Sequence, residues 1–344
     1  MKRIVKVSFI MPVYNCSNCV IRAIESILNQ TYKNIELIII NDGSTDNTLD
    51  KIIKYQSDKR VKIINQKNKG PSYARNIGIN NSTGDYIAFC DGDDYLDEDI
   101  VSKFVDFQKK KDYLYDVVLF KTVRIENGNL IDKTSFNESF SFSKTEKKLL
   151  IDSIFNKFLK YNSIFGFDGI CGKFISSSLI KKNCIQYPNN VYRFEDAKFC
   201  KDVYFHSDNI YYLNETGYFY IKNENSLSNK FDKNAVKIFK DALISLGSEN
   251  YSNNNFYIKT LTTLTECENM YYLNEKNNKK FKILKNEFRE MIIYDIYKDA
   301  IYKVKFTSVP FHYKIEIILL RLNMINTYFL LKKMHLSLKK IKHK

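Results

Sequence analysis

The sequence lacks an uninterrupted apolar run of about 18 residues, the length that a membrane-spanning helix requires. It also lacks the pattern of a secretory signal peptide, because the apolar stretch 4–11 is short and leads directly into a polar loop. We therefore expect neither a transmembrane helix nor a leader peptide, and we expect a cytoplasmic location.

Two motifs with a defined chemistry are also missing. The seven cysteines include one C-x-x-C, formed by Cys16 and Cys19, and no second pair that could complete a zinc site. We expect mostly free thiols in a reducing compartment. No G-x-G-x-x-G follows the first apolar run, where residues 12–15 read PVYN, and this disfavours a dinucleotide-dependent oxidoreductase.

Negative charge is in the minority, since 54 Lys and Arg against 39 Asp and Glu give a net charge of +15. This balance suggests an anionic partner, which could be nucleic acid, anionic lipid or a phosphorylated substrate. The chain is also rich in Lys, Asn, Ile, Tyr and Phe, a bias that codon usage can produce. A basic membrane- or nucleic-acid-binding module without catalysis therefore stays an alternative to an enzyme.

The sequence does contain a regular alternation of strand and helix patterns. Apolar runs typical of buried strands alternate with segments of helical spacing, in the order 4–11, 19–30, 35–40, 49–53, 61–65, 71–80 and 86–89. This order predicts an α/β fold with a mainly parallel sheet and helices on both faces.

The pattern loosens beyond residue 97, and 344 residues exceed one ordinary domain. We expect a main domain over 1–230 and a helical region over 231–344. In the later part of the main domain, residues 130–165 read as an insertion over the sheet. The other expected elements there are a helix at 100–110, a strand at 117–125, a helix at 147–160 and strands at 210–213 and 218–221.

An acidic run directly after the strand 86–89 is the central candidate site. It contains Asp91, Asp93 and Asp94, and burying like charges together is costly unless a cation neutralises them. Carboxylate oxygens suit Mg²⁺ or Mn²⁺, which usually bind one or two carboxylates together with substrate phosphates. Because the carboxyl ends of parallel strands share one edge, Tyr14 and Asp42 are expected to converge on the same ligand.

A second carboxylate pair, Glu195 and Asp196, opens a predicted helix. One of these groups could act as general base toward an acceptor hydroxyl. A Glu–Asp pair at a helix start also stabilises the positive end of the helix dipole, so the pattern by itself leaves both interpretations open.

The last 44 residues contain ten Lys or Arg and one acid, Glu316. Ile318, Leu322, Ile325 and Phe329 share one predicted helix face. Such a basic amphipathic segment can lie on an anionic membrane surface, with each basic residue contributing about 1 kcal/mol. The alternative is a helix that packs on its own domain and carries a solvated basic tail.

Four segments resemble, in order and spacing, the motifs of family 2 glycosyltransferases of the GT-A fold. They are residues 8–15 (SFIMPVYN), 40–46 (INDGSTD), 70–76 (GPSYARN) and 91–94 (DGDD). A weaker resemblance to bacterial members runs from 172–173 through 195–196 to Tyr220 and 226–228. The resemblance implies a Rossmann-like GT-A domain with a nucleotide-binding half at 1–110 and an acceptor-side half at 111–230.

The resemblance also implies which residues bind the donor. Tyr14 would pack on the base of the nucleotide with Pro12 and Val13 beside it, and Asp42 would hydrogen-bond the uracil. Arg75 would contact the base or the diphosphate. Asp91, followed by the tolerant position Gly92, would hold the ribose or the water shell of the metal, and Asp93 would bind Mn²⁺ or Mg²⁺.

For the transfer step, the resemblance implies that Asp196 is the general base, with Glu195 as the fallback. Lys173 would lie near the phosphates or the acceptor, or would be an ordinary surface lysine. The implied activity is inverting transfer of a hexose or N-acetylhexosamine from a UDP-sugar to a glycan acceptor, lipid-linked at the inner face of the cell membrane. Cell-surface polysaccharide or lipopolysaccharide would be the product, another nucleotide sugar stays an alternative donor, and no nucleic-acid partner is expected.

Overall fold

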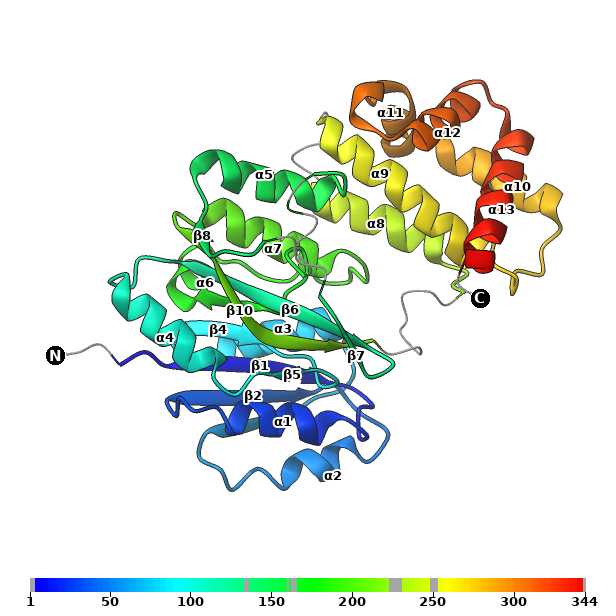
Figure 1. Cartoon of the computed structure of the whole chain (residues 1–344). Coiled ribbons are helices and arrows are strands. Elements are labelled where there is room, and N and C mark those ends of the chain that lie inside the picture. The colour runs from blue at the N-terminus through cyan, green and yellow to red at the C-terminus, as the bar shows by residue number, and fades with distance from the viewer. Residues whose placement is uncertain are drawn as a thin grey trace. The chain divides into compact units, whose positions relative to one another are not determined.

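The computed structural model describes residues 4–132, 136–159, 161, 166–222, 231–247 and 253–342. The chain forms two compact units (Figure 1). The first consists of Met1–Ile154 and Leu159–Glu224, and the second of Phe155–Phe158 and Asn225–Lys344. The short segment Phe155–Phe158 therefore belongs to the second unit although it lies within the sequence of the first.

Strands and helices alternate through the first part of the first unit, as the sequence predicts. The elements are β1 (Val7–Val13), α1 (Val20–Leu28), β2 (Ile35–Asn41), α2 (Thr48–Ile53), β3 (Val61–Asn65), α3 (Pro71–Asn81), β4 (Tyr86–Phe89), β5 (Tyr95–Leu96) and α4 (Ile100–Lys110). The elements that follow are β6 (Val117–Glu126), β7 (Asn129–Ile131), β8 (Phe140–Ser141), α5 (Lys144–Phe155), β9 (Lys173–Ser176), α6 (Ser177–Lys182), α7 (Glu195–His206) and β10 (Ile210–Ile221).

One sheet runs through the whole first unit in the order β3-β2-β1-β4-β9-β6-β10-β5. The β3-β2-β1-β4 part is parallel throughout, and β10 is parallel to β6. Strand β9 is antiparallel to both of its neighbours, β4 and β6, so it joins the two parallel parts. The expected mainly parallel sheet is confirmed, with antiparallel additions at β5, β7, β8 and β9.

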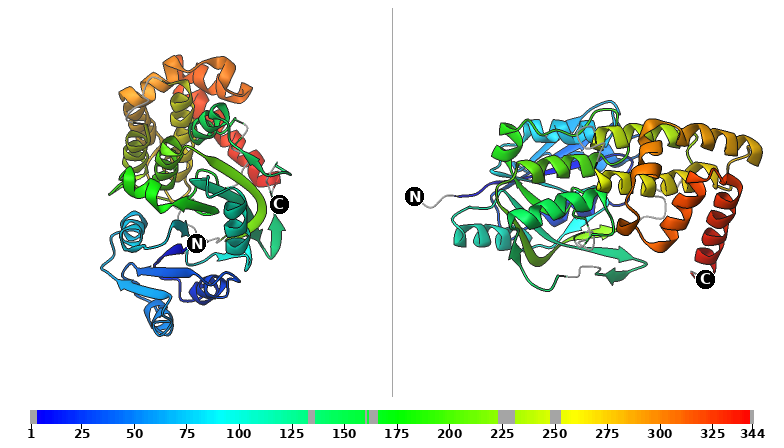
Figure 2. Two further views of the ribbon diagram at one scale, coloured as in Figure 1. Left: turned by 90° about the vertical axis from the view of Figure 1, so that its left-hand side faces the viewer. Right: turned by 90° about the horizontal axis from the view of Figure 1, so that it is seen from above.

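The two faces of the β1–β2 region bury different residues. Phe9 and Met11 belong to the apolar cluster that includes residues of α1 and α4. Ile10 points to the other face, where a Cβ added at Gly78 of α3 would lie only 2.3 Å from its side chain. Because strand side chains alternate between faces, β1 packs against both helix layers, and Figure 2 shows α1 and α3 on opposite sides of the sheet.

Two expectations for the later part of this unit need correction. The strands predicted at 210–213 and 218–221 are one continuous strand, β10, whose pairing with β6 shifts register between Leu213 and Thr216 and again before Tyr218. Such irregularities bend a strand without ending it. Within the expected insertion at 130–165, β7 and β8 pair with β6 and β10, and α5 begins at Lys144 and ends at Phe155.

The second unit is helical, as its sequence predicts. Its elements are α8 (Ala235–Gly247), α9 (Asn254–Cys267), a π-helical turn η3 (Glu268–Tyr272), α10 (Phe281–Ile292), α11 (Asp295–Lys303), a 3-10 turn η4 (Phe306–Ser308), α12 (Phe311–Arg321) and α13 (Ile325–Lys342). Among the described residues, no helix is both long and apolar enough to span a bilayer.

The prediction that Ile318, Leu322, Ile325 and Phe329 share one helix face is wrong. Asn323 has a positive φ of 55° and ends α12, so the predicted face is divided between two helices. Ile325 and Phe329 are 1% exposed and belong to the core of the unit, whereas Ile318 is 42% and Leu322 63% exposed. The side chains of Lys339, Lys340, Lys342 and Lys344 lie outside the described part of the chain.

Candidate active site

The loops that follow β1, β2 and β4 lie against one another at one edge of the sheet. The side-chain oxygen of Asn15 accepts a hydrogen bond of 2.8 Å from the backbone N–H of Thr45. Gly92 approaches the first loop so closely that a Cβ there would lie 3.0 Å from Val13 and 3.0 Å from Cys16. The predicted meeting of these loops is confirmed, a shared ligand stays a prediction, and the close approach explains why position 92 is a glycine.

Within the acidic run, Asp94 is the most deeply buried carboxylate. It accepts hydrogen bonds from the hydroxyl of Tyr218 at 2.6 Å and from the backbone N–H of Ile221 at 2.8 Å. The same Tyr218 hydroxyl accepts a bond of 3.2 Å from the backbone N–H of Asp91. Strand β10 therefore fixes the shape of this loop from the other half of the sheet.

Burial and mutual repulsion disfavour ionisation of these carboxylates. Burial, followed by the charges of Asp91 and Asp93, raises the pKa of Asp94 to about 8. The pKa of Asp93 is raised by burial and by the charge of Asp91. Positive charge brought to this loop would relieve both effects.

Arg75, which projects from α3, connects the two carboxylate sites that the sequence singled out. Its guanidinium lies 3.0 Å from Asp91 and 3.2 Å from Asp196, and its side chain is 6% exposed. Burial alone would lower the pKa of Arg75, but Asp196 and Asp91 outweigh burial and raise it well above its ordinary value. The ring of Tyr187 lies under the guanidinium, with 5.3 Å between the guanidinium carbon and the ring centre.

Asp196 and Glu195 form the first turn of α7, which follows Phe194 in a left-handed conformation with a φ of 59°. Burial raises the pKa of Asp196 although Arg75 opposes it, and the charge of Asp91 adds to the rise. Burial and the charge of Asp196 raise the pKa of Glu195. A carboxylate with a raised pKa is a stronger base, as proton abstraction from a hydroxyl requires.

Asp42 lies at the end of β2, is 3% exposed and organises the neighbouring loop. It accepts hydrogen bonds of 2.8 Å from the side chain of Gln66 and from the backbone N–H groups of Lys69 and Gly70. These bonds determine the path of the chain into α3 and hence the position of Arg75.

The remaining residues of the predicted donor site surround this edge. Pro12 and Val13 close β1, where they pair with Ile40 and Asn41 of β2. Tyr14 follows them and is 51% exposed, which leaves its aromatic side chain accessible at this edge of the sheet. Such a side chain can stack on a planar base.

Lys173 is not the surface lysine that one of its two interpretations expected, and its charge acts to lower the pKa of Asp196. It is 2% exposed, and its ammonium donates hydrogen bonds to the backbone carbonyls of Gly166 at 2.7 Å, Gly169 at 2.5 Å and Cys171 at 3.2 Å. The surface-lysine alternative is therefore wrong. Lys173 holds the glycine-rich loop before β9 in place.

The acidic loop has oxygen donors that fit a hard divalent cation. The ligand atoms of Asp91, Asp94 and Cys171 lie within 4.8 Å of one another, and Asp93 is not part of this group. Burial raises the pKa of the Cys171 thiol well above its ordinary value, and both oxygens of Asp94 already accept hydrogen bonds. The better candidates are therefore Oδ2 of Asp91 and the carboxylate of Asp93.

Tyr218, Tyr187 and Cys171 were not predicted from the sequence. Tyr218 reaches the acidic run from β10, and Tyr187 exchanges two backbone hydrogen bonds with the side chain of Asn76, of 2.9 and 3.0 Å. No local sequence pattern distinguishes these tyrosines from the others, because their roles depend on partners far away in the chain.

Known proteins resemble the chain in both sequence and fold. The family model described as Glycosyl transferase family 2 matches residues 8–173. An uncharacterized glycosyltransferase of Rickettsia felis is 42% identical over 127 residues, which are 37% of this chain and 21% of that protein. Glycosyltransferase GlyA of Streptococcus pneumoniae is 33% identical over 251 residues, which are 69% of this chain and 34% of that protein.

Among solved structures, residues 1–349 of S. aureus TarS in complex with UDP-GlcNAc align with a TM-score of 0.67 and 19% identity, over 96% of this chain and 92% of that one. The chain spans only 19% to 34% of the length of the first four curated relatives. The likeness to TarS shows that this chain has the GT-A fold. Residues 8–173 are therefore similar in sequence to family 2 of the glycosyltransferases.

Proposed function

We propose that this protein transfers a hexose or N-acetylhexosamine from a UDP-sugar to a glycan acceptor, with inversion at the anomeric carbon. The observation that carries the proposal is the position of Arg75 between Asp91 and Asp196. A single buried cation joins the acidic loop suited to a metal and diphosphate with the carboxylate suited to act as a base. These are the two functions that a single-displacement glycosyl transfer needs.

In the proposed reaction, Asp196 accepts the proton of an acceptor hydroxyl. The hydroxyl oxygen forms a bond to the anomeric carbon of the sugar, and the bond between that carbon and the β-phosphate oxygen breaks. UDP leaves with the bonding electron pair, so inversion follows from attack on the opposite side. Glu195, the neighbouring residue in the first turn of α7, is the fallback for the base.

Asp91 and Asp93 would hold Mn²⁺ or Mg²⁺. The metal would stabilise the negative charge that develops on the departing diphosphate. Tyr14, Pro12, Val13 and Asp42 would form the base-binding side of the donor site. The structure of TarS with UDP-GlcNAc supports a UDP-sugar as donor, because that protein shares the fold.

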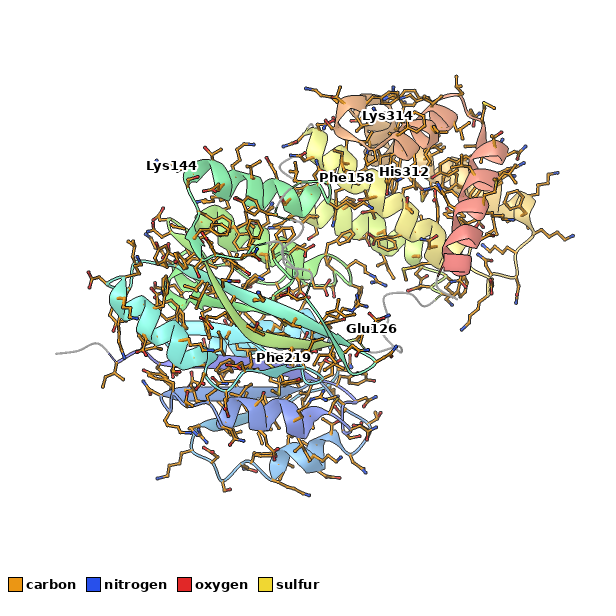
Figure 3. All side chains as sticks on the ribbon, in the orientation of Figure 1. Glu126, Lys144, Phe158, Phe219, His312 and Lys314 are labelled. Carbon is orange, nitrogen blue, oxygen red and sulfur yellow. The ribbon has the colours of Figure 1, made fainter. Side chains whose placement is uncertain are left out.

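We further propose that the protein acts at the inner face of the cell membrane, on a lipid-linked acceptor for a cell-surface polysaccharide or lipopolysaccharide. Phe311 and Ile318 of α12 and Leu322, which directly follows the helix, form an exposed apolar stripe, and Phe311 is 74% exposed. Figure 3 shows Lys314 on the same helix. The single acid among the last 44 residues, Glu316, is buried against Lys332, so the stripe has basic neighbours that suit anionic lipid.

The experiment that tests the donor and metal sites is thermal stabilisation by a panel of nucleoside diphosphates and UDP-sugars, with and without Mn²⁺. We expect UDP to raise the Tm, Mn²⁺ to increase the shift, and one UDP-sugar to exceed UDP. In the Asp93→Asn variant, the Mn²⁺-dependent part should disappear while the Tm without ligand is retained. A folded protein that no nucleotide stabilises would contradict the proposed donor site.

A further inference from the structure

A polar cavity of about 470 Å³ lies in the first unit, between the start of α3 and the loop that leads to α7. Residues 68–73 form one wall and residues 189–192 the other. None of the residues assigned above to the donor, the metal or the base lines it. Its function is therefore a separate question.

The walls of this cavity are fixed to the proposed active site. One wall continues into Arg75, and the other continues into Asp196, four residues after Tyr192. Asn76 fixes the chain before the second wall by its two hydrogen bonds to the backbone of Tyr187. The Arg75–Asp196 ion pair links the segments that continue from the two walls. Both walls are therefore continuous in sequence with residues of the proposed active site.

The residues around the cavity suit an uncharged sugar. Three are asparagines, Asn68, Asn189 and Asn190, and each amide offers donors and acceptors to hydroxyl groups that also do both. None of the lining residues is acidic, and the only cation, Lys69, already lies over the ring of Tyr73 at 4.4 Å. The side chains that line the cavity therefore offer an anion little free positive charge.

Two further features point to a ligand that is both polar and ring-shaped. The side chain of Tyr192 is 64% exposed, an arrangement that leaves an aromatic face open for the apolar face of a sugar ring. Ser72 is only 6% exposed, and its hydroxyl has no hydrogen-bond partner among the described residues. A polar ligand at this wall would relieve the cost of that unpaired group.

We infer that this cavity binds a pyranose unit of the acceptor glycan and presents the acceptor to Asp196. The inference rests on the proposed function, since it assigns the acceptor side of the same transfer. Tyr192 would stack on the sugar ring, and the asparagine amides would bind its hydroxyls.

The absence of tryptophan from the chain allows a direct test. The Tyr192→Trp variant keeps an aromatic face and places one fluorescent reporter at the cavity. Phe205→Trp is the matched control, because Phe205 is an exposed aromatic residue of α7 in the same unit. Each variant is titrated with the methyl glycosides of glucose, galactose, N-acetylglucosamine and N-acetylgalactosamine.

We expect at least one glycoside to change the emission of Tyr192→Trp saturably and to leave Phe205→Trp unchanged. When Asn189→Ala is added to the Tyr192→Trp variant, glycoside binding should weaken by about 3- to 10-fold, which is the effect of losing one hydrogen bond. Equal responses in the two tryptophan variants, or no saturable response, would overturn the inference. So would displacement of the glycoside by UDP, because the cavity would then belong to the donor. Glycoside binding without any stabilisation by UDP would instead count against the proposed function alone.

Discussion

Arg75 determines the geometry of the candidate active site at the scale of single residues. An arginine stays protonated at every physiological pH and can donate to two carboxylates at once. Here it faces Asp91 from the acidic loop and Asp196 from α7. The acidic loop and the proposed base are therefore held at a fixed separation, as a transfer between two bound substrates requires.

The Asp196→Asn variant tests the role of the base. Asparagine keeps the shape of the side chain but cannot accept the proton, so we expect transfer to fall by about 10²- to 10⁴-fold. UDP affinity, measured by calorimetry, should stay close to that of the wild type, and the Glu195→Gln variant should retain most of the transfer rate. Weakened UDP binding with unchanged turnover of the bound donor would argue against a base at position 196.

A second charged cluster lies in the core of the helical unit and has no part in the proposed reaction. The ammonium of Lys332 lies 2.7 Å from Glu316 and 3.4 Å from Glu268, and Glu268 is fully buried. Tyr328 donates a hydrogen bond to Glu268. Burial raises the pKa of Glu268 to about 6, although Lys332 and Tyr328 oppose the rise.

The raised pKa of Glu268 predicts a pH-dependent stability. The carboxyl is neutral in both states below about pH 4.5, and above about pH 6 the folded state bears the cost of burying the charge. This contribution is therefore present at low pH and is lost as the pH rises through 6, a change of about 2 kcal/mol. We expect the Tm of the wild type to fall relative to that of the Glu268→Gln variant as the pH rises from 4.5 to 7. A constant difference between the two Tm values across this range would contradict the assignment.

At the scale of elements, the packing of α3 on the sheet depends on Gly78. A Cβ at this position would lie 2.3 Å from the side chain of Ile10 and 3.1 Å from that of Ile40. The helix that carries Arg75 can therefore approach β1 and β2 closely only because this residue has no side chain.

The Gly78→Ala variant should be destabilised in spite of the higher helix propensity of alanine. We expect overpacking against Ile10 to lower the free energy of unfolding by about 1–3 kcal/mol in urea denaturation. Asn80→Ala is the control, because Asn80 is exposed on the same helix and its substitution should cost little. Equal stability of the two variants would show that α3 can move outward without cost.

The apolar stripe at α12 predicts where the protein contacts lipid. Replacing both Phe311 and Leu322 by Glu removes two large apolar side chains and adds negative charge. We expect binding to phosphatidylserine-containing vesicles to weaken at least about tenfold in a sedimentation assay. Leu130→Glu is the control, because Leu130 is an exposed leucine of β7 in the other unit.

Two results would contradict a lipid-binding stripe. One is equal vesicle binding by the double variant and the wild type. The other is loss of a dimer in gel filtration on substitution of the stripe, which would identify a second copy of the chain as its partner.

At the scale of the whole molecule, the two units cannot be separated by a single cut. Residues Phe155–Phe158 precede α7 and β10 of the first unit in sequence but pack within the helical unit. Asn156 donates a hydrogen bond of 3.0 Å to Asn255, and Lys157 donates one of 3.0 Å to Tyr313. The ring of Phe155 packs edge-on against Phe256.

A fragment that ends at residue 224 should therefore fold poorly alone. It would expose Phe155 and Phe158 without their packing partners, so we expect aggregation or a lower Tm. Co-expression with a fragment that begins at residue 225 should give a complex that purifies together, and Phe155→Ala with Phe158→Ala should weaken it. A monodisperse 1–224 fragment that unfolds at the temperature of the intact chain would contradict this division.

Much of the first unit could be predicted from the sequence because its signals are local. The strand β3 and the helix α4 have the predicted bounds, and β2 and α3 extend one residue beyond them. The carboxyl-edge loops are predictable as well, since parallel strands necessarily bring their ends together. The burial of Ile325 and Phe329 was not predictable, because it depends on the turn at Asn323 and on the helices around it.

The sequence by itself determined the family motifs, the strand–helix order and the helical nature of the second unit, because periodicity and turn residues act over a few neighbours. Only the tertiary structure decided that Arg75 joins Asp91 to Asp196, that Tyr218 supports the acidic loop, and that Lys173 is buried. Each of these depends on side chains from separate elements meeting in space. The energy of a buried charge is set by such distant partners, and no local pattern records them.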